Sequence, residues 1–153
     1  MTRLRREGEH VKVLFRLEKD EDGYPPEDVE SLWGVLRSEG VELDNIPFFA
    51  KGVALGDMLK VQEAPDGALE FDGVVQRGGH STYRILLVKK RPGDPKHTMD
   101  ELIDLGLSVE EDAGLLAVDV PPDVSLASIR EYLFEGIDSG RWEAEEAYRA
   151  GPS

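Results

Sequence analysis

Apolar and polar residues alternate near the N-terminus, from Val11 to Leu17. A period of two is typical of a strand with one buried face, so the sequence predicts a strand over residues 11–18. An acidic connector follows at residues 20–28, where consecutive prolines disfavour a regular ladder. A second strand is predicted over 32–36 with a hairpin partner over 41–43, although a short helix over 26–36 is an alternative interpretation.

The middle of the chain repeats the hairpin pattern. Two further strands, over 57–63 and 69–76, flank the Pro-x-Gly turn that begins at Pro65. The run from Thr82 to Lys90 has the most strand-like composition in the chain. Several short strands separated by glycines favour a small, bent antiparallel sheet or partial barrel.

The last third changes from period two to helical spacing. Thr98 and Glu101 form a capping box before a short apolar stripe, and Gly106 is placed where a left-handed C-cap belongs. A buried strand over 114–120 ends at two prolines. A second helix is predicted over 125–138, behind a cap at Asp123 or Ser125, because apolar residues recur at helical intervals. Those apolar residues are Leu126, Ile129, Leu133 and Ile137.

These elements define an α+β fold: a small bent antiparallel sheet or partial barrel followed by a ferredoxin-like βαβα half. Strand 11–18 is expected to join the sheet of 82–90 and 114–120. The tail over 140–148 is expected to form a short helix or turn that docks Trp142 and Tyr148. We expect a flexible basic arm over 1–9, one domain over 10–149 with sublobes of about 20–80 and 81–149, and a tail over 150–153.

The composition excludes several classes of chemistry. The chain has 153 residues, of which 40% are hydrophobic, and it has no cysteine. Disulfides, thiolate nucleophiles and cysteine-ligated metal centres are therefore ruled out. We expect a cytoplasmic protein with no membrane partner, because no signal-peptide pattern and no apolar run long enough to span a bilayer is present.

The net charge of -14 is unevenly distributed. Residues 1–19 carry net charge +3, residues 20–92 carry -6 and residues 93–153 carry -11. Such a field repels nucleic acid and anionic lipid and favours a basic partner. An acidic surface that only maintains solubility is the alternative explanation.

Two loops contain more special residues than a connector needs. In residues 43–50, polar Asp44 and Asn45 precede a proline and two adjacent phenylalanines. In residues 76–84, two glycines can direct backbone N–H groups toward one point. A rigid turn in the first loop and a tight turn in the second are the structural alternatives. We predict that the loops form one concave ligand-binding site. Its residues are Asp44, Asn45, Phe49, His80, Ser81, Thr82 and Arg84.

No motif in the chain demands catalysis. The histidines lack metal-ligand spacing, and no P-loop, dinucleotide fingerprint or nucleophile elbow is present, so no metal and no cofactor is expected. His80 as a general base, with Asp44 orienting it and Arg84 holding an anion, is geometrically conceivable. Whether the protein is an enzyme is left open.

Six motifs resemble those of a bacterial family of small proteins known only by a domain-of-unknown-function label. The resemblance covers residues 11–148 and implies no reaction. The motifs are Glu30-x-Leu32-Trp33, Leu43-Asp44-Asn45-Ile46-Pro47-Phe48-Phe49, Gly52-x-x-x-Gly56-Asp57, Gly79-His80-Ser81-Thr82-x-Arg84, Val118-Asp119-Val120-Pro121 and Gly140-Arg141-Trp142-x-x-Glu145-Glu146.

The hypothesis favoured by these observations is a non-enzymatic binding or regulatory protein that acts on a basic protein partner. An immunity-type or antitoxin-like inhibitor would be one example. The alternative is a small enzyme or ligand-sensing module that binds an anionic metabolite in a pocket of Asp44, His80 and Arg84.

Overall fold

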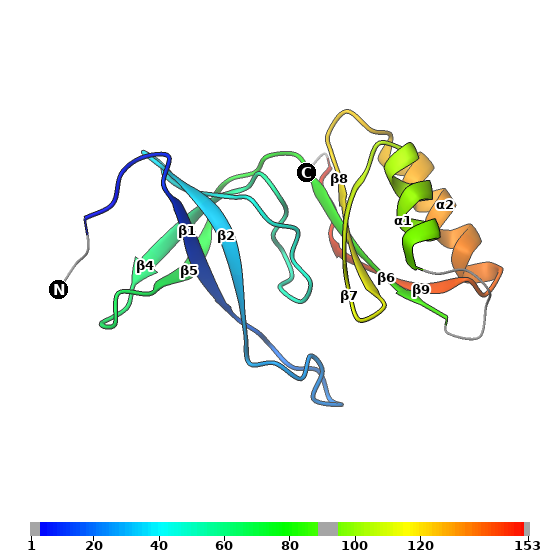
Figure 1. Ribbon diagram of the computed structural model, residues 1–153, viewed down its shortest axis with the longest axis horizontal. Coiled ribbons are helices and arrows are strands. Elements are labelled where there is room, and N and C mark those ends of the chain that lie inside the picture. The colour runs from blue at the N-terminus through cyan, green and yellow to red at the C-terminus, as the bar shows by residue number, and fades with distance from the viewer. Residues whose placement is uncertain (1–3, 89–94, 152–153) are drawn as a thin grey trace.

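The computed structural model describes residues 4–88 and 95–151 as two lobes that lie side by side (Figure 1). The first lobe is built from strands β1 to β5, and the second from four strands and both helices. The fold is therefore α+β, with a bent five-stranded sheet, as the sequence predicts. The elements are β1 (His10–Arg16), β2 (Val29–Arg37), β3 (Gly40–Leu43), β4 (Met58–Glu63), β5 (Leu69–Gln76), β6 (Ser81–Leu87), α1 (Pro95–Asp104), β7 (Ser108–Asp112), β8 (Leu115–Val120), α2 (Leu126–Asp138) and β9 (Trp142–Tyr148).

The first lobe is a closed barrel in the order β1-β2-β3-β4-β5. Successive strands are antiparallel, so the first and fifth of an odd number run in the same direction, and β1 pairs with β5 in parallel. Closure leaves no free sheet edge in this lobe. Gly34 permits a close approach of β2 and β3, because a Cβ atom there would overlap the side chain of Val41.

The barrel core follows the alternation of the strands. Val11, Val13 and Phe15 point inward from β1, while the residues between them are exposed or only partly buried. The rings of Phe15 and Phe71 stack with centroids 4.7 Å apart. The strand reading of residues 32–36 is confirmed, and the alternative helix over 26–36 is wrong, because β2 continues through this segment.

The second lobe is an antiparallel sheet in the order β7-β8-β6-β9. Helices α1 and α2 cover the face that points away from the barrel (Figure 1). Leu133 of α2 and Ile85, Leu116 and Val118 of the sheet are almost fully buried between these layers. The opposite face of the sheet points toward the barrel.

Two expectations about the strands are wrong. Strand 11–18 does not join the sheet of β6 and β8, since β1 pairs with β2 and β5 of the barrel. Its alternation specifies one buried face but not which core covers that face. The tail forms strand β9 rather than a helix or turn, pairing along β6. In addition, β7 was not expected, because the acidic run Ser108–Asp112 has little apolar character and lies at a sheet edge.

The two predicted helices are present. Helix α2 begins behind Ser125, whose Oγ accepts a hydrogen bond from the Ser128 N–H at 3.3 Å. Helix α1 begins at Pro95, three residues before the Thr98 predicted as its cap, and Thr98 is buried within it. The last two residues of the strand predicted over 82–90 lie outside the described residues, as do residues 1–3 of the predicted arm and 152–153 of the predicted tail.

Candidate functional site

The long connection between β3 and β4, residues 44–57, joins the barrel to the sheet of the second lobe. The Gly52 N–H donates to the Ala147 carbonyl at 3.1 Å. The buried Thr82 hydroxyl donates to the Val53 carbonyl at 3.1 Å. These bonds connect β6 and β9 to neighbouring residues of this connection. We call residues 44–57 the junction segment.

Glu30 holds the first part of the junction segment in place. Its carboxylate accepts hydrogen bonds from the backbone N–H groups of Phe48, Phe49 and Ala50, at 2.8, 3.1 and 2.9 Å. The sequence predicts no role for Glu30 beyond its place in a motif. No local signal pairs a strand glutamate with backbone amides eighteen residues later, because the contact depends on barrel closure.

The first predicted loop makes contacts mainly within the barrel lobe. The Asn45 Oδ1 accepts a hydrogen bond from the Trp33 N–H at 2.6 Å. Asp44 is exposed, with its carboxylate 3.8 Å from the Nε2 atom of His10. The Phe49 ring meets the Tyr24 ring edge-on, with centroids 6.1 Å apart.

The second predicted loop contains a histidine–aspartate pair. His80 Nδ1 lies 2.8 Å from the Oδ2 atom of Asp119, which is 1% exposed. Burial raises the pKa of Asp119 above its ordinary value, and the hydrogen bond with His80 acts in the opposite direction. The other carboxylate oxygen of Asp119 has no hydrogen-bond partner among the described residues. The neighbouring Ser81 accepts a hydrogen bond from the Ala150 N–H at 2.9 Å.

Asp57 is a second buried carboxylate at this junction. It is fully buried and accepts hydrogen bonds at 3.0 Å from the Ala54 N–H, the Gly78 N–H and the Arg77 guanidinium. The Arg77 guanidinium also lies 4.1 Å from the centre of the Tyr148 ring. These contacts make Asp57 a structural group that joins the β3–β4 connection to the segment after β5.

Arg84 is a buried cation between the lobes. It is 4% exposed, donates through Nη2 to the Ala50 carbonyl, and places Nη1 3.6 Å from the Glu145 carboxylate. Its Nε and Nη1 atoms have no hydrogen-bond partner among the described residues. Burial lowers the pKa of Arg84, while Glu145, Glu30 and Tyr24 act to raise it.

The structure thus brings Thr82 and Arg84 to the lobe junction, while Asp44, Asn45 and Phe49 contact residues of the barrel lobe. Two pockets lie in the second lobe. One, of about 250 Å³, is lined by Ser81 together with Pro121, Pro122 and the chain end at Ala150 and Gly151. None of the other six predicted residues lines either pocket. A single concave site made by both loops stays a prediction.

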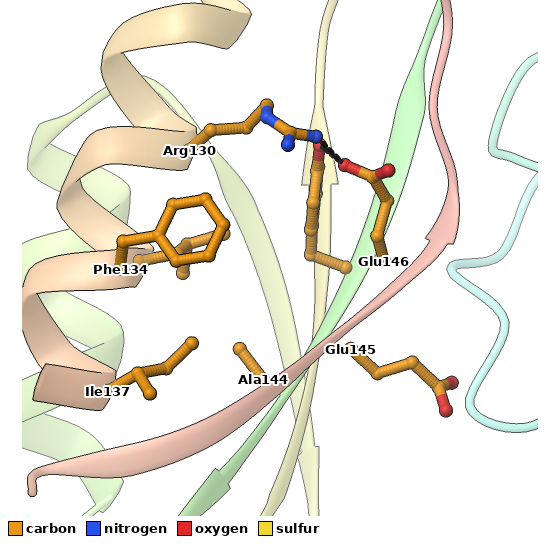
Figure 2. Close-up of a pocket in the computed structure, with 8 residues that line it drawn as sticks. Arg130, Phe134, Ile137, Ala144, Glu145 and Glu146 are labelled. Carbon is orange, nitrogen blue, oxygen red and sulfur yellow. Dashed lines mark hydrogen bonds and ion pairs between the residues drawn. The ribbon is translucent and has the colours of Figure 1, made fainter.

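The other pocket is a half-open groove of about 230 Å³ between α2 and β9. Its floor is largely apolar, and Phe134 and Ile137 are 53% and 38% exposed there. Figure 2 shows Phe134, Ile137 and Ala144 turned toward the space between helix and strand, while Glu145 points to the other side of the sheet. The remaining lining residues are Tyr83, Arg130, Leu133 and Glu146.

A polar cluster closes one end of this groove. The Tyr83 hydroxyl donates to the Glu146 carboxylate at 2.6 Å, and Arg130 forms an ion pair with the same carboxylate (Figure 2). Burial and the bond to Glu146 raise the pKa of Tyr83 to about 12. The phenol is therefore a hydrogen-bond donor at neutral pH.

The sequence does not predict this groove when the tail over 140–148 is taken as a helix or turn. A signal was present: Trp142 and Ala144 alternate with Glu143 and Glu145 in the period of a strand. The alternation is interrupted at Glu146, near the position where the pairing of β9 with β6 shifts register.

Comparisons with known proteins agree with this fold. The architecture is that of a small α+β protein with a barrel lobe and a mixed helix–sheet lobe. The chain belongs to the family described as Domain of unknown function (DUF4265), whose model matches residues 30–144. The expected membership of such a family is confirmed.

A solved structure has a similar fold. It is described as "Novel crystal structure of a hypothetical protein from Neisseria gonorrhoeae", and it is 18% identical with a TM-score of 0.75. The similarity covers 97% of this chain and 100% of the other. A search of curated proteins finds no match.

Two features are absent from residues 4–88 and 95–151. Neither α1 nor α2 has the length and apolar character that crossing a membrane requires. Within the same ranges, no group of three or more His, Asp or Glu side chains is arranged to hold a metal ion.

Proposed function

We propose that this protein is a non-enzymatic binding or regulatory protein that binds a basic segment of a partner protein at the groove between α2 and β9. The observation that carries the proposal is the combination of exposed apolar side chains in this groove with acidic residues around it. As part of the proposal, the protein acts in the cytoplasm of a bacterium, and an immunity-type or antitoxin-like inhibitor is one form it could take.

The charge around the groove supports a basic partner. Residues 126–148, which contain α2 and β9, carry six acidic side chains and two basic ones. Charged groups of opposite sign accelerate association and select against wrong partners. Apolar residues that stay exposed beside a polar rim are typical of a protein-binding surface.

We also infer that the second lobe has the ferredoxin-like arrangement expected from the sequence. Its elements follow the order strand-helix-strand-strand-helix-strand. The first and last strands of the sheet, β7 and β9, form its two edges. The groove lies at one of these edges, since β9 ends the strand order.

The proposed function is tested with synthetic peptides of about eight residues, a usual strand length. One library alternates Lys or Arg with Val, Ile, Leu or Phe, and a second replaces the basic residues with Glu. Fluorescence anisotropy should detect binding of basic peptides only. The association rate should fall as salt rises from about 50 to 500 mM, because salt screens exposed charges.

A pair of charge variants provides the control. Glu143 is exposed on β9, whereas Glu39 is exposed in the turn between β2 and β3 of the barrel. Glu143→Lys should weaken binding of the basic peptides, and Glu39→Lys makes the same change in net charge without affecting the groove. If neither library binds, or if the two variants lose affinity equally, the proposal is wrong.

A second candidate function is sensing of a small anion by Arg84. The observation that favours it is the buried guanidinium whose Nε and Nη1 atoms lack hydrogen-bond partners among the described residues. Buried donors of this kind are costly unless a water or ligand satisfies them. A carboxylate or phosphate group is the chemistry that a guanidinium binds best.

A further inference from the structure

Among the described residues, no strand pairs with the outer edge of β9 beside the groove, although near the end of the strand the Ala147 carbonyl accepts a hydrogen bond from the Gly52 N–H. Strand β9 pairs with β6 and ends the strand order of the sheet. The Val88 N–H donates to the Arg141 carbonyl at 3.1 Å. Because backbone groups alternate in direction along a strand, Glu143 and Glu145 point their N–H and C=O groups toward β6. Ala144 and Glu146 therefore point theirs outward.

The outward backbone groups and the groove belong to the same surface. Ala144 and Glu146 line the groove, and so do Phe134 and Ile137 of α2. A strand added beside β9 would continue the sheet, and alternate side chains of that strand would lie on the helix-covered face. Those side chains would contact Phe134 and Ile137, which are exposed without a partner strand.

The other face of the added strand would meet acidic side chains. Glu145 points away from α2 in Figure 2, and Glu143 shares this face because side chains two residues apart point the same way. Glu145 already lies 3.6 Å from Arg84 and 3.8 Å from Lys51. No ion pair is found for Glu143 among the described residues, which leaves its carboxylate available to an incoming cation.

These charges also decide against a second copy of the chain as the added strand. An antiparallel pair of β9 strands would bring glutamates at positions 143, 145 and 146 close to one another. Like charges on neighbouring strands are destabilising. A strand with basic residues on one face is complementary instead.

We propose that β9 binds an extended segment of a partner protein by β-strand addition, and that this segment alternates basic with apolar residues. The apolar side chains occupy the groove over Phe134 and Ile137, and the basic side chains lie beside Glu143 and Glu145. This inference rests on the proposed function and adds the mode of binding and the sequence pattern of the partner.

The test uses the tightest-binding basic peptide of the alternating library and the chain of 153 residues. Two N-methylated forms are made, one blocked at the odd-numbered amides and the other at the even-numbered amides. Only one set of amides faces β9 in a strand addition. One form should therefore lose about tenfold or more in affinity through two or more lost hydrogen bonds, and the other should keep most of its affinity.

A pair of protein variants tests the hydrogen bonds between the peptide and β9 by changing β9 instead of the peptide. Ala144→Pro removes an outward N–H without removing a hydrogen bond to β6, and proline is tolerated on edge strands. Ala144→Ser keeps the N–H and adds only one atom. Peptide affinity should fall about tenfold in the proline variant and stay near wild type in the serine variant. Circular dichroism and thermal unfolding establish that both variants are folded.

The possible outcomes separate the binding mode from the proposed function. Strand addition is supported if only one N-methylated form loses affinity. It is also supported if folded Ala144→Pro loses affinity for the peptide and Ala144→Ser does not. Basic peptides that bind wild type while both N-methylated forms keep their affinity overturn strand addition and leave the proposed function standing. If both forms lose affinity and Ala144→Pro does not, strand addition is also wrong. Absence of any peptide binding overturns both proposals.

Discussion

Individual polar residues at the lobe junction have roles that depend on burial. Thr82 is fully buried and donates to a backbone carbonyl of the junction segment. Asp119 is equally inaccessible, and only one of its two carboxylate oxygens has a partner among the described residues. A buried carboxylate with an unsatisfied oxygen lowers stability when it is ionised.

The pH dependence of stability should report the ionisation of Asp119. Because burial raises the pKa of this carboxyl, the folded protein retains a proton that the unfolded chain releases above about pH 4. The free energy of unfolding should therefore fall as pH rises from the ordinary pKa to the raised pKa. The difference in the free energy of unfolding between wild type and Asp119→Asn isolates the contribution of Asp119. Urea unfolding across this pH range measures it.

His80→Ala provides the control for this assignment. The hydrogen bond and charge of His80 lower the pKa of Asp119, so removing the imidazole should move the fall in stability to higher pH. Glu110, whose pKa is also raised by burial, is present in both proteins and cancels in the difference. If the free energy of unfolding varies with pH in parallel for wild type and Asp119→Asn, the prediction is wrong.

At the scale of elements, α2 and β9 depend on each other. The Trp142 indole N–H donates to the Leu133 carbonyl at 3.0 Å. A Cβ atom at Gly136 would overlap the Trp142 ring, so a glycine is required for the helix to lie this close to the strand. The glycine is buried in the helix for packing rather than for its conformational freedom.

Leu133→Ala should lower the free energy of unfolding by about 2–5 kcal/mol, as truncations of buried leucine do. Leu133 is 4% exposed and belongs to the core between α2 and the sheet. Chemical denaturation followed by circular dichroism measures the change. A loss below about 1 kcal/mol would show that the helix does not pack as described.

Phe134→Ala is the matched control on the same helix. The ring is 53% exposed in the groove, so its loss should change stability by less than about 1 kcal/mol. The same variant should weaken binding of the basic peptides, because the ring forms part of the apolar floor. Leu133 and Phe134 thus separate the core of the lobe from its proposed binding surface.

At the scale of the whole molecule, two separate cores are joined by the junction segment. One core lies inside the barrel and the other between the sheet and the helices. The Gly52 N–H donates a hydrogen bond to the second lobe, and the carbonyl groups of Val53 and Ala50 accept hydrogen bonds from it. Arg84 is the charged group at the centre of these contacts.

Thermal unfolding in different salts should decide whether Arg84 binds an anion. If the second candidate function holds, the wild type should be more stable in citrate or phosphate than in chloride at equal ionic strength. An anion at ten times its dissociation constant adds about 1.4 kcal/mol by mass action. Arg84→Met should lose that anion-specific gain.

The comparison is made within each protein, so a general loss of stability in Arg84→Met does not obscure it. Equal gains in both proteins would mean that the anions act without Arg84. The guanidinium would then be part of the scaffold that joins the lobes, with the Ala50 carbonyl and Glu145 as its partners.

The sequence alone determined the elements whose pattern is local. Val11, Val13 and Phe15 alternate because one face of β1 is buried, and Leu126 to Leu133 recur at helical spacing behind the Ser125 cap. The hairpin turns were equally visible from glycine and proline. Membership of a domain-of-unknown-function family was also predicted from the sequence, and the family model over residues 30–144 confirms it.

Only the tertiary structure decided which strands share a sheet and what the polar loops contact. The alternation of β1 suits either core, and barrel closure selects the first. The amide contacts of Glu30 and the burial of Arg84 depend on residues many positions away. The open edge of β9 likewise exists only because β6 pairs with β8 on its other side. Such long-range contacts leave no periodic trace in the sequence, since they depend on how two cores are joined in space.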